Sequence, residues 1–312
     1  MFRQDRTNPS TAVSTWKGRK DLAKANPSTA VSAWMNGGLA GGGAFSAYGG
    51  VITQYEDSGT TYRVHAFRGT GTFTVVAGSA DVDYLIVAGG AATRMGGAGA
   101  GGMLTGTGVT VDTASSPYTI TVGAGGSGGT SPTNGANSVA LGVTATGGGK
   151  GGAWTAETGT AGGSGGGGGG AYSGGPFSGG SGTVGQGNDG GDAPDYTAGG
   201  GGGAGAAGVT GTNDGNTATM NYGGNGGAGA TGYGISATTP IYAGGGGGSA
   251  ASGGGGATMG AGLGLLGGGG AAHASGVADG GVPNTGGGAG GSWSVYSEDG
   301  GSGIVLIRYA VA

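Results

Sequence analysis

The sequence predicts a mainly β protein in which strands form a framework around an inserted glycine-rich unit, with a short helical segment in front. Three observations predict this organisation. Glycine supplies 94 of the 312 residues, about 30% where roughly 7% is usual. Strand-like segments occur at 51–147 and again at 292–312, on either side of the glycine-rich middle. Near the N-terminus, a repeated nine-residue sequence carries the signals that begin a helix.

The predicted helical segment covers residues 1–36. NPSTAVSTW at 8–16 recurs as NPSTAVSAW at 26–34, and asparagine before proline is typical of a helix cap followed by the first helical position. Helices this short are marginal alone in water, so we expect them to dock on a partner or on copies of themselves. The alternative is a surface hairpin packed on its own domain. The candidate anchoring residues are Arg3, Arg6, Trp16, Lys17, Arg19 and Trp34.

The charges are distributed unevenly along the chain. Six of the 11 basic residues lie in the first 24 positions, with only two acidic residues among them, although the whole chain has a net charge of −4. This asymmetry indicates two parts with separate roles. A single weak basic patch is seldom a specific footprint for nucleic acid, so we expect no nucleic-acid partner.

A glycine-rich linker at 37–50 leads into the predicted strands. From 51 to 147 the chain contains short stretches rich in β-branched and aromatic residues, such as TTYRVHAFRG, GTFTVVAG and DVDYLIVAGG. Such stretches, separated by turn residues, are typical of β-strands. The pattern returns at 292–312, which ends in GIVLIRYAVA. Pairing of this terminal strand with the strands of 51–147 would bring the two ends of the glycine-rich insert together.

The insert at 148–291 alternates nearly pure Gly/Ala runs with segments of 8–15 residues that contain aromatic residues, Asn, Asp and Thr. An extended helix with three residues per turn has no internal backbone hydrogen bonds, so its N–H and C=O groups need partners on neighbouring helices. Only glycine permits that close approach. We therefore predict a packed bundle of such helices, with the intervening segments as loops at its ends. The alternative from composition is a disordered low-complexity tract.

Seven aromatic residues in these loop segments are the candidate binding residues. Aromatic side chains on rigid supports bury a large area with few rotors to freeze, which suits contact with a sugar face or a protein loop. The alternative is that several of them pack inward and cap the ends of the bundle. The seven are Trp154, Tyr172, Phe177, Tyr196, Tyr222, Tyr233 and Tyr242.

The sequence contains no constellation typical of an enzyme or of a cofactor site. It has no cysteine, which excludes disulfides, thiol catalysis and cysteine-based zinc sites. Its two histidines have no neighbouring carboxylate at ligand spacing. Asp189, Asp192 and Asp195 recur every third residue and would share one face of a three-residue helix. They are a candidate calcium site, with a solvated acidic loop as the alternative.

Over roughly residues 50–312, the chain resembles the glycine-rich domain of bacteriophage tail-fibre and adhesin proteins. The resemblance rests on YRVHAFRGTGTFTV at 62–75, VDYLIVAGG at 82–90, YTITVGAGG at 118–126 and the terminal GGSGIVLIRY at 300–309. It implies an antiparallel β-sandwich framework that carries a polyglycine-II bundle, with variable distal loops that contact the bacterial surface. No motif of that family covers residues 1–50.

The resemblance leads us to expect a tail-fibre or tail-tip adhesin, without enzymatic activity, that is assembled in the host cytoplasm and located on the virion. Residues 1–36 would attach it to other tail or baseplate proteins, and its loops would bind a surface glycan or an outer-membrane protein. We expect a homotrimer, with a monomeric tip adhesin as the alternative. The alternative functions are a capsid decoration or head-fibre protein, a non-viral extracellular ligand-binding domain, and a polysaccharide depolymerase. No apolar stretch approaches about 18 residues and the start lacks the apolar segment of a secretory signal, so membrane insertion is not expected.

Overall fold

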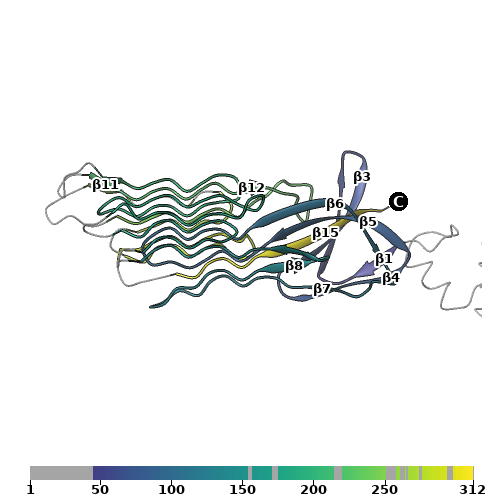
Figure 1. Cartoon of the computed structure of the whole chain (residues 1–312). Helices are drawn as coiled ribbons and strands as arrows, with labels where there is room; N and C mark the ends of the chain where they lie inside the picture. The colour runs from purple at the N-terminus through teal and green to yellow at the C-terminus, as the bar shows by residue number, and fades with distance from the viewer. Residues whose placement is uncertain are drawn as a thin grey trace, which may run out of the picture.

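The computed structural model describes residues 45–153, 157–170, 175–213, 220–250, 258–260, 264, 266–273, 276–293 and 298–311. This part of the chain is elongated (Figure 1), with β-sheets at one end and a bundle of extended, glycine-rich passes at the other. The described residues contain β-strands and no helix, which confirms the mainly β prediction. The predicted helices within 1–36 lie outside the described residues.

Fifteen strands are present in the described residues. They are β1 (Ser46–Tyr48), β2 (Val51–Asp57), β3 (Thr60–Phe67), β4 (Gly71–Ala77), β5 (Ser79–Val87), β6 (Met103–Asp112), β7 (Tyr118–Ile120), β8 (Ser138–Ala140), β9 (Val143–Ala145), β10 (Thr212–Asn213), β11 (Met220–Tyr222), β12 (Ala230–Thr231), β13 (Ile241–Tyr242), β14 (Thr258–Gly260) and β15 (Ile304–Ala310). The strand pairings are antiparallel, apart from the parallel pairing of β11 with β14.

Two sheets form the framework at one end of the molecule. A five-stranded sheet has the order β2-β3-β15-β5-β6, and a three-stranded sheet has the order β1-β4-β7. Their side chains share one core, to which β4 and β7 contribute Phe73 and Ile120 while β5 and β15 contribute Ile86 and Val305. The terminal strand β15 lies between β3 and β5, so the end of the chain completes a sheet that begins more than 200 residues earlier, as the sequence predicts.

The glycine-rich bundle consists of extended glycine-rich segments, here called passes, that lie side by side and are joined by backbone hydrogen bonds. Along one pass, the direction of these bonds turns around the axis of the pass and repeats every three residues. The pass at 96–102 shows this most clearly, because successive amides donate to three different neighbouring passes. The donor–acceptor pairs are Gly96–Gly152, Gly99–Gly149 and Gly102–Thr146 with the first neighbour, Gly97–Gly199 and Ala100–Gly202 with the second, and Ala98–Ala289 and Gly101–Gly286 with the third, at N···O distances of 2.8–3.0 Å. Backbone groups that point sideways are thus satisfied in every direction, as the three-residue helix requires.

The bundle is too close-packed for side chains at most positions. A Cβ atom added at Gly97 would lie 2.0 Å from the carbonyl oxygen of Gly246, and one at Gly99 would lie 2.2 Å from that of Ser164. Alanine occurs where there is room for its methyl group: Ala98 is buried in a small cluster with Ala91 and Ala289. The pass at 96–102 therefore has glycine at its close backbone contacts and alanine at position 98, where methyl groups meet.

The passes continue the register of the strands from which they emerge. In the β5–β6 hairpin Val87 pairs with Met103, and beyond it the amides of Ala88 and Ala91 donate to the carbonyls of Gly102 and Gly99 at 3.0 Å. In this way residues 88–102 run within the bundle, although they lie between framework strands in the sequence. The β5–β6 hairpin of the framework thus sets the alignment of the two passes that extend from it.

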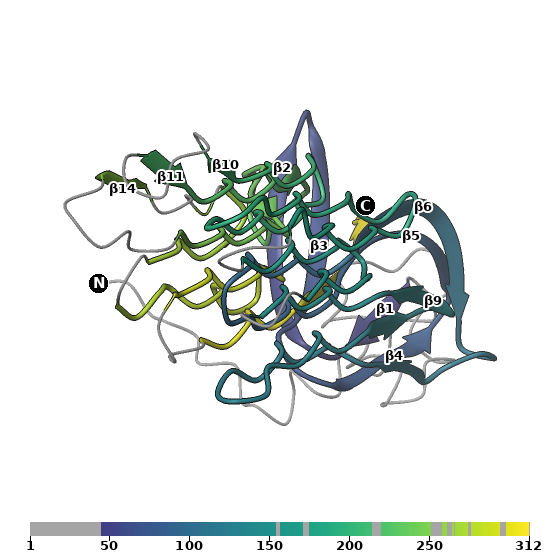
Figure 2. The ribbon, with the colours of Figure 1, turned by 60° about the vertical axis from the view of Figure 1, so that its left-hand side comes forward.

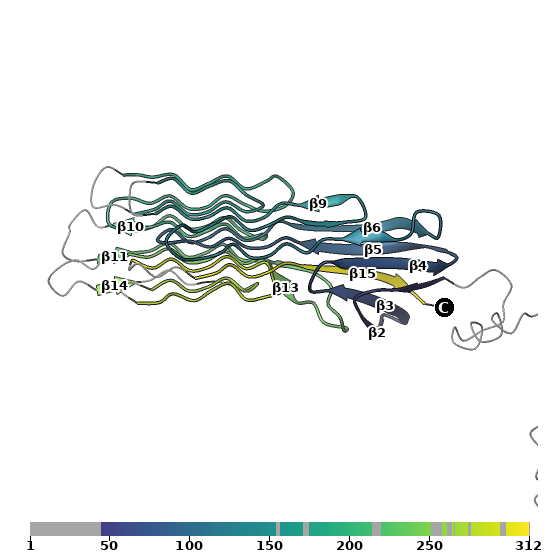
Figure 3. The same ribbon diagram turned by 90° about the horizontal axis from the view of Figure 1, so that it is seen from below.

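The two ends of the bundle differ. Figures 1 and 3 place β10, β11 and β14 at the end remote from the framework, and β12 and β13 at the end beside it. Figure 2, turned to look more nearly along the passes, shows them stacked in several layers rather than in one sheet. Both β1 and β15 lie in the framework, so the two ends of the described chain are on the same side of the molecule. In the described part, nothing helical is long and apolar enough to cross a membrane.

The framework core contains a buried histidine. The Nδ1 atom of His65 lies 2.8 Å from the carbonyl oxygen of Gly49, and Nε2 lies 3.2 Å from the hydroxyl of Tyr309. Because only a protonated Nδ1 can donate to a carbonyl, Nε2 of the neutral ring accepts from Tyr309. Burial lowers the pKa of His65 below its ordinary value of 6.5, which outweighs the opposing effect of the bond to Gly49. His65 therefore has a structural role in the core.

This histidine predicts how stability depends on pH. A group whose pKa is lowered by folding binds more protons in the unfolded state, so stability falls as the pH decreases through the unfolded pKa of about 6.5. We expect the melting temperature to drop between pH 7.5 and 5.5 in the native chain and to drop less in His65→Gln. Equal pH dependence of the two proteins in thermal denaturation would contradict this assignment.

Candidate functional site

The remote end of the bundle holds three of the sequence-predicted binding residues. Tyr222 in β11 is 38% exposed. Tyr196 is half-buried, and its φ of 64° lies in the left-handed region that residues other than glycine seldom adopt. Phe177 is half-buried and exchanges two backbone hydrogen bonds of 2.9 Å with Ala193. Two further candidates, Trp154 and Tyr172, lie outside the described residues.

Tyr233 and Tyr242 lie at the opposite end of the bundle, beside the framework. Tyr242 in β13 is only 6% exposed and belongs to a second core cluster with Leu85 and Met103. Tyr233 packs against the same cluster, and its ring lies 4.2 Å from the guanidinium carbon of Arg308. These two residues cap the bundle where it meets the five-stranded sheet, which is the alternative role weighed for the aromatic residues above.

The acidic row belongs to the edge of the bundle. Asp189 and Asp192 are exposed and Asp195 is half-buried. Each carboxylate accepts a hydrogen bond from an amide of the neighbouring pass, and the pairs are Gly182–Asp189 at 2.8 Å, Gly179–Asp192 at 2.9 Å and Gly175–Asp195 at 2.8 Å. No group of three or more possible metal ligands is present among the described residues. The three-residue step from Asp189 to Asp192 therefore matches the step between Gly182 and Gly179, whereas the step to Asp195 faces a four-residue step on the neighbouring pass, from Gly179 to Gly175.

A second row of the same kind was not anticipated from the sequence. Asn134 and Asn137 are also three residues apart, and their Oδ1 atoms accept from the amides of Lys150 at 2.9 Å and Gly147 at 2.8 Å. An outer pass has no neighbour on its open side, so its amides need other acceptors. The signal in the sequence is the spacing: Asx residues at i and i+3 beside a glycine run indicate an edge pass.

The acidic row supports a prediction. Replacing Asp189, Asp192 and Asp195 together by alanine removes three acceptors and should lower the free energy of unfolding by about 1–2 kcal/mol in total, because exposed hydrogen bonds contribute little each. Replacing all three by asparagine retains an oxygen acceptor at every position and should preserve most of the stability. Denaturant titrations of both variants measure the difference. A calcium-dependent melting temperature that the asparagine variant abolishes would instead establish a metal site.

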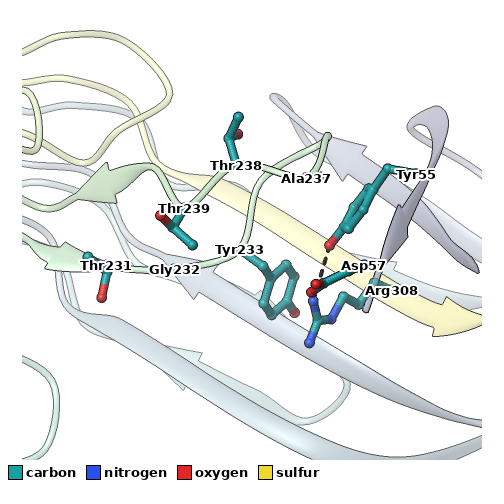
Figure 4. Close-up of a pocket in the computed structure, with 9 residues that line it drawn as sticks. All are labelled: Tyr55, Asp57, Thr231, Gly232, Tyr233, Ala237, Thr238, Thr239 and Arg308. Atoms are coloured by element: carbon teal, nitrogen blue, oxygen red, sulfur yellow. Dashed lines mark hydrogen bonds between the residues drawn. The ribbon is translucent and has the colours of Figure 1, made fainter. Parts of the chain in front are cut away.

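The side of the framework carries a cluster around Arg308 in β15. Its Nε donates to Oδ2 of Asp83 at 3.1 Å and its Nη1 to the hydroxyl of Tyr55 at 3.1 Å. The guanidinium also lies over the rings of Tyr62 at 4.5 Å and Tyr233 at 4.2 Å. Figure 4 shows Arg308 between Tyr55 and Tyr233 at one side of a cavity of about 260 Å³. The cluster links β2, β3, β5, β15 and the segment after β12.

A family model described as a glycine-rich domain matches residues 65–310. The chain belongs to this glycine-rich domain family. The matched region of the glycine-rich domain begins at His65 in β3 and ends at Ala310, the last residue of β15, so it covers most of the framework and all described passes of the bundle. Neither a curated protein nor a solved structure matches the chain. The predicted anchoring residues in 1–36 lie outside both the match and the described residues.

The glycine-rich domain explains the terminal motif GGSGIVLIRY physically. A Cβ at Gly301 would lie 2.2 Å from the carbonyl oxygen of Val282, and one at Gly303 would lie 2.1 Å from that of Val87, so these positions accept only glycine. Arg308 and Tyr309 point to opposite faces of the sheet, since successive strand residues alternate. Tyr309 stacks on His65 in the core, and Arg308 forms the lateral cluster.

Proposed function

We propose that the chain is the receptor-binding part of a bacteriophage tail fibre or tail tip, in which a polyglycine-II bundle on a β-sandwich framework displays the remote loops. The observation that carries the proposal is the difference between the two ends of the molecule. Both ends of the described chain belong to the framework. Tyr222 is in β11 at the remote end (Figure 1), and the left-handed Tyr196 follows Asp195, whose carbonyl accepts from Asn213 of β10 at that same end (Figure 3). Membership of the glycine-rich domain family and the resemblance to tail-fibre and adhesin proteins support this reading.

The physical argument for a rigid display stalk comes from the hydrogen bonds. Each pass is bonded sideways to several others, and a Cβ has no room at most contacts, so the passes cannot slide without breaking many bonds together. Binding residues held on such a support lose little further entropy when they contact a receptor. In this proposal residues 1–36 attach the chain to other tail or baseplate proteins, and three chains assemble as a homotrimer.

The first test is immunogold labelling of intact virions with an antibody against residues 150–290. Gold at the tail tip or fibres is the expected result. Gold over the capsid would overturn the proposal in favour of a capsid decoration protein. The oligomeric state is measured separately by light scattering of the purified full chain, with a trimer expected.

The second test asks which end binds. We expect Tyr222→Ala to reduce binding of the full chain to host cells at least about tenfold, because a buried aromatic contact is worth more than about 1.4 kcal/mol. Tyr48→Ala is the matched control, since Tyr48 is 55% exposed but lies on β1 in the framework. Equal binding by the two variants, with unchanged melting temperatures, would show that the remote end is not the contact surface.

A further inference from the structure

The cavity beside Arg308 is formed where the segment after β12 crosses strands β2 and β15. Tyr55 and Asp57 of β2, Arg308 of β15, and Tyr233, Thr238 and Thr239 of the crossing segment line it. Its volume of about 260 Å³ is smaller than the pockets that hold drug-sized ligands, which begin at about 300 Å³. The cavity therefore suits one small ring rather than an extended molecule.

The cavity presents hydrogen-bonding groups together with aromatic rings. Arg308 uses one N–H for Asp83 and one for Tyr55, and the rest of its N–H groups have no acceptor among the described residues. Thr238 and Thr239 are exposed at the opening, and Figure 4 shows them on the segment opposite Tyr55 and Arg308. Burial raises the pKa of Tyr233 well above its ordinary value. Its neutral hydroxyl donates to the carbonyl oxygen of Leu306 at 3.4 Å, so Tyr233 contributes its ring rather than its hydroxyl to the cavity.

The charged side chains in and beside the cavity disfavour a negatively charged ligand. The guanidinium of Arg308 is already paired with Asp83, which lies outside the cavity lining, and another carboxylate, Asp57, lines the cavity itself. A negatively charged ligand would meet this carboxylate and a cation that is already shared with Asp83, which is unfavourable at short range. A neutral ligand with several hydroxyl groups avoids this repulsion. It can donate to a carboxylate and accept from the guanidinium, and its apolar ring face can pack on a tyrosine.

We propose that this cavity is a binding subsite for a single neutral sugar residue: a hexose, a deoxyhexose or an N-acetylhexosamine. A purely structural clamp accounts for the contacts of Arg308 with Asp83, Tyr62 and Tyr233. It does not account for the exposed hydroxyl of Thr239 and the unengaged N–H groups of Arg308 around one opening; the hydroxyl of Thr238 is within 3.2 Å of that of Ser236. The subsite lies at the framework end of the bundle, so it does not depend on receptor binding at the remote end.

Saturation-transfer NMR on the full chain tests the proposal, with free glucose, galactose, rhamnose, fucose and N-acetylglucosamine as neutral probes and glucuronic acid as the anionic probe. We expect transfer to at least one neutral sugar, with a dissociation constant on the order of 1 mM, equivalent to about −4 kcal/mol. Glucuronic acid is expected to bind more weakly. Absence of transfer to every neutral probe, or preference for the anionic one, would overturn the proposal.

Matched substitutions locate the binding. Thr239→Val and Tyr55→Phe each remove a hydroxyl at the cavity and should weaken binding of the responding sugar about three- to tenfold, the effect of one hydrogen bond. Thr72→Val and Tyr48→Phe are the controls, because both residues are exposed on framework strands away from the cavity. Thr239→Val removes only an exposed hydroxyl, so its melting temperature should match that of Thr72→Val. An equal affinity of these two variants would place the sugar elsewhere and contradict the assignment.

Discussion

Replacing Gly97 by alanine is expected to destabilise the protein by about 3 kcal/mol or more, at or above the usual upper range for overpacking a core. The added methyl group would lie 2.0 Å from the carbonyl oxygen of Gly246 and 2.5 Å from the amide nitrogen of Gly201. These two atoms are hydrogen-bonded to each other at 2.8 Å. The methyl group would therefore enter a backbone hydrogen bond between two neighbouring passes, and no side-chain rotation can relieve the contact.

Two controls separate this effect from the general consequences of changing glycine. Gly69→Ala adds the same methyl group where nothing lies within 4 Å, and we expect a change within about 0.5 kcal/mol. Ala98→Gly removes a methyl group from the next position of the same pass and should cost about 1 kcal/mol. The denaturant midpoints of the three variants measure these changes in the free energy of unfolding, provided that the slope of that free energy against denaturant concentration stays constant. Equal midpoints for Gly97→Ala and Gly69→Ala would refute close packing of the passes.

The second large effect is expected at Arg308. Arg308→Met retains the aliphatic stem but removes the charge, which leaves Asp83 and the hydroxyl of Tyr55 without their donor. The side chains of Arg308 and Asp83 are 18% and 22% exposed, between the surface pairs that contribute up to about 1 kcal/mol and the buried pairs that cost about 3–5 kcal/mol to break. With the loss of two cation–π contacts, we expect a destabilisation of about 2–3 kcal/mol.

A double-mutant cycle with Asp83→Asn tests whether the loss comes from the ion pair. If it does, the double variant will be more stable than the sum of the single effects predicts, with a coupling of about 1 kcal/mol or more. Additive effects would mean that Arg308 stabilises the protein through its stem and the tyrosine rings alone. The cycle also shows whether the lateral cluster holds the segment after β12 on the framework, because Tyr233 contacts the same guanidinium.

Most strand positions were predictable because the strands are short stretches rich in β-branched and aromatic residues, separated by turn residues. The strands from β2 to β9, and the return of the chain at 304–310, follow from the β-branched and aromatic stretches of 51–147 and 292–312. The edge strand β1 (Ser46–Tyr48) was missed: it lies in the segment 37–50 that was predicted to be a linker, and its place on the sheet comes from pairing with β4. The assignment of 88–102 to the bundle did not follow. Those residues continue the hydrogen-bond register of the β5–β6 hairpin, and the sequence does not show where a pleated pair becomes a pair of glycine-rich passes.

The candidate residues illustrate the same division. The aromatic residues were recognised as a set, but two groups at opposite ends of the bundle share one sequence context. Tyr233 and Tyr242 pack at the framework, whereas Tyr222 is exposed at the remote end. The chain changes direction between one pass and the next, so successive connections along the sequence lie at opposite ends of the bundle. The sequence shows the alternation, but it does not show which turn begins at which end.

The sequence by itself determined the composition of the bundle, the three-residue spacing of Asp189, Asp192 and Asp195, and the strand character of the terminal motif. These are local properties, fixed by what each residue type allows in its own backbone. The tertiary structure alone decided that those carboxylates accept hydrogen bonds from amides of the pass at 175–182. It also decided that Arg308 donates to Tyr55 and Asp83 and lies over the ring of Tyr233. Such contacts join residues from about 7 to more than 200 positions apart, and they exist only because many sideways hydrogen bonds align the passes and strands together.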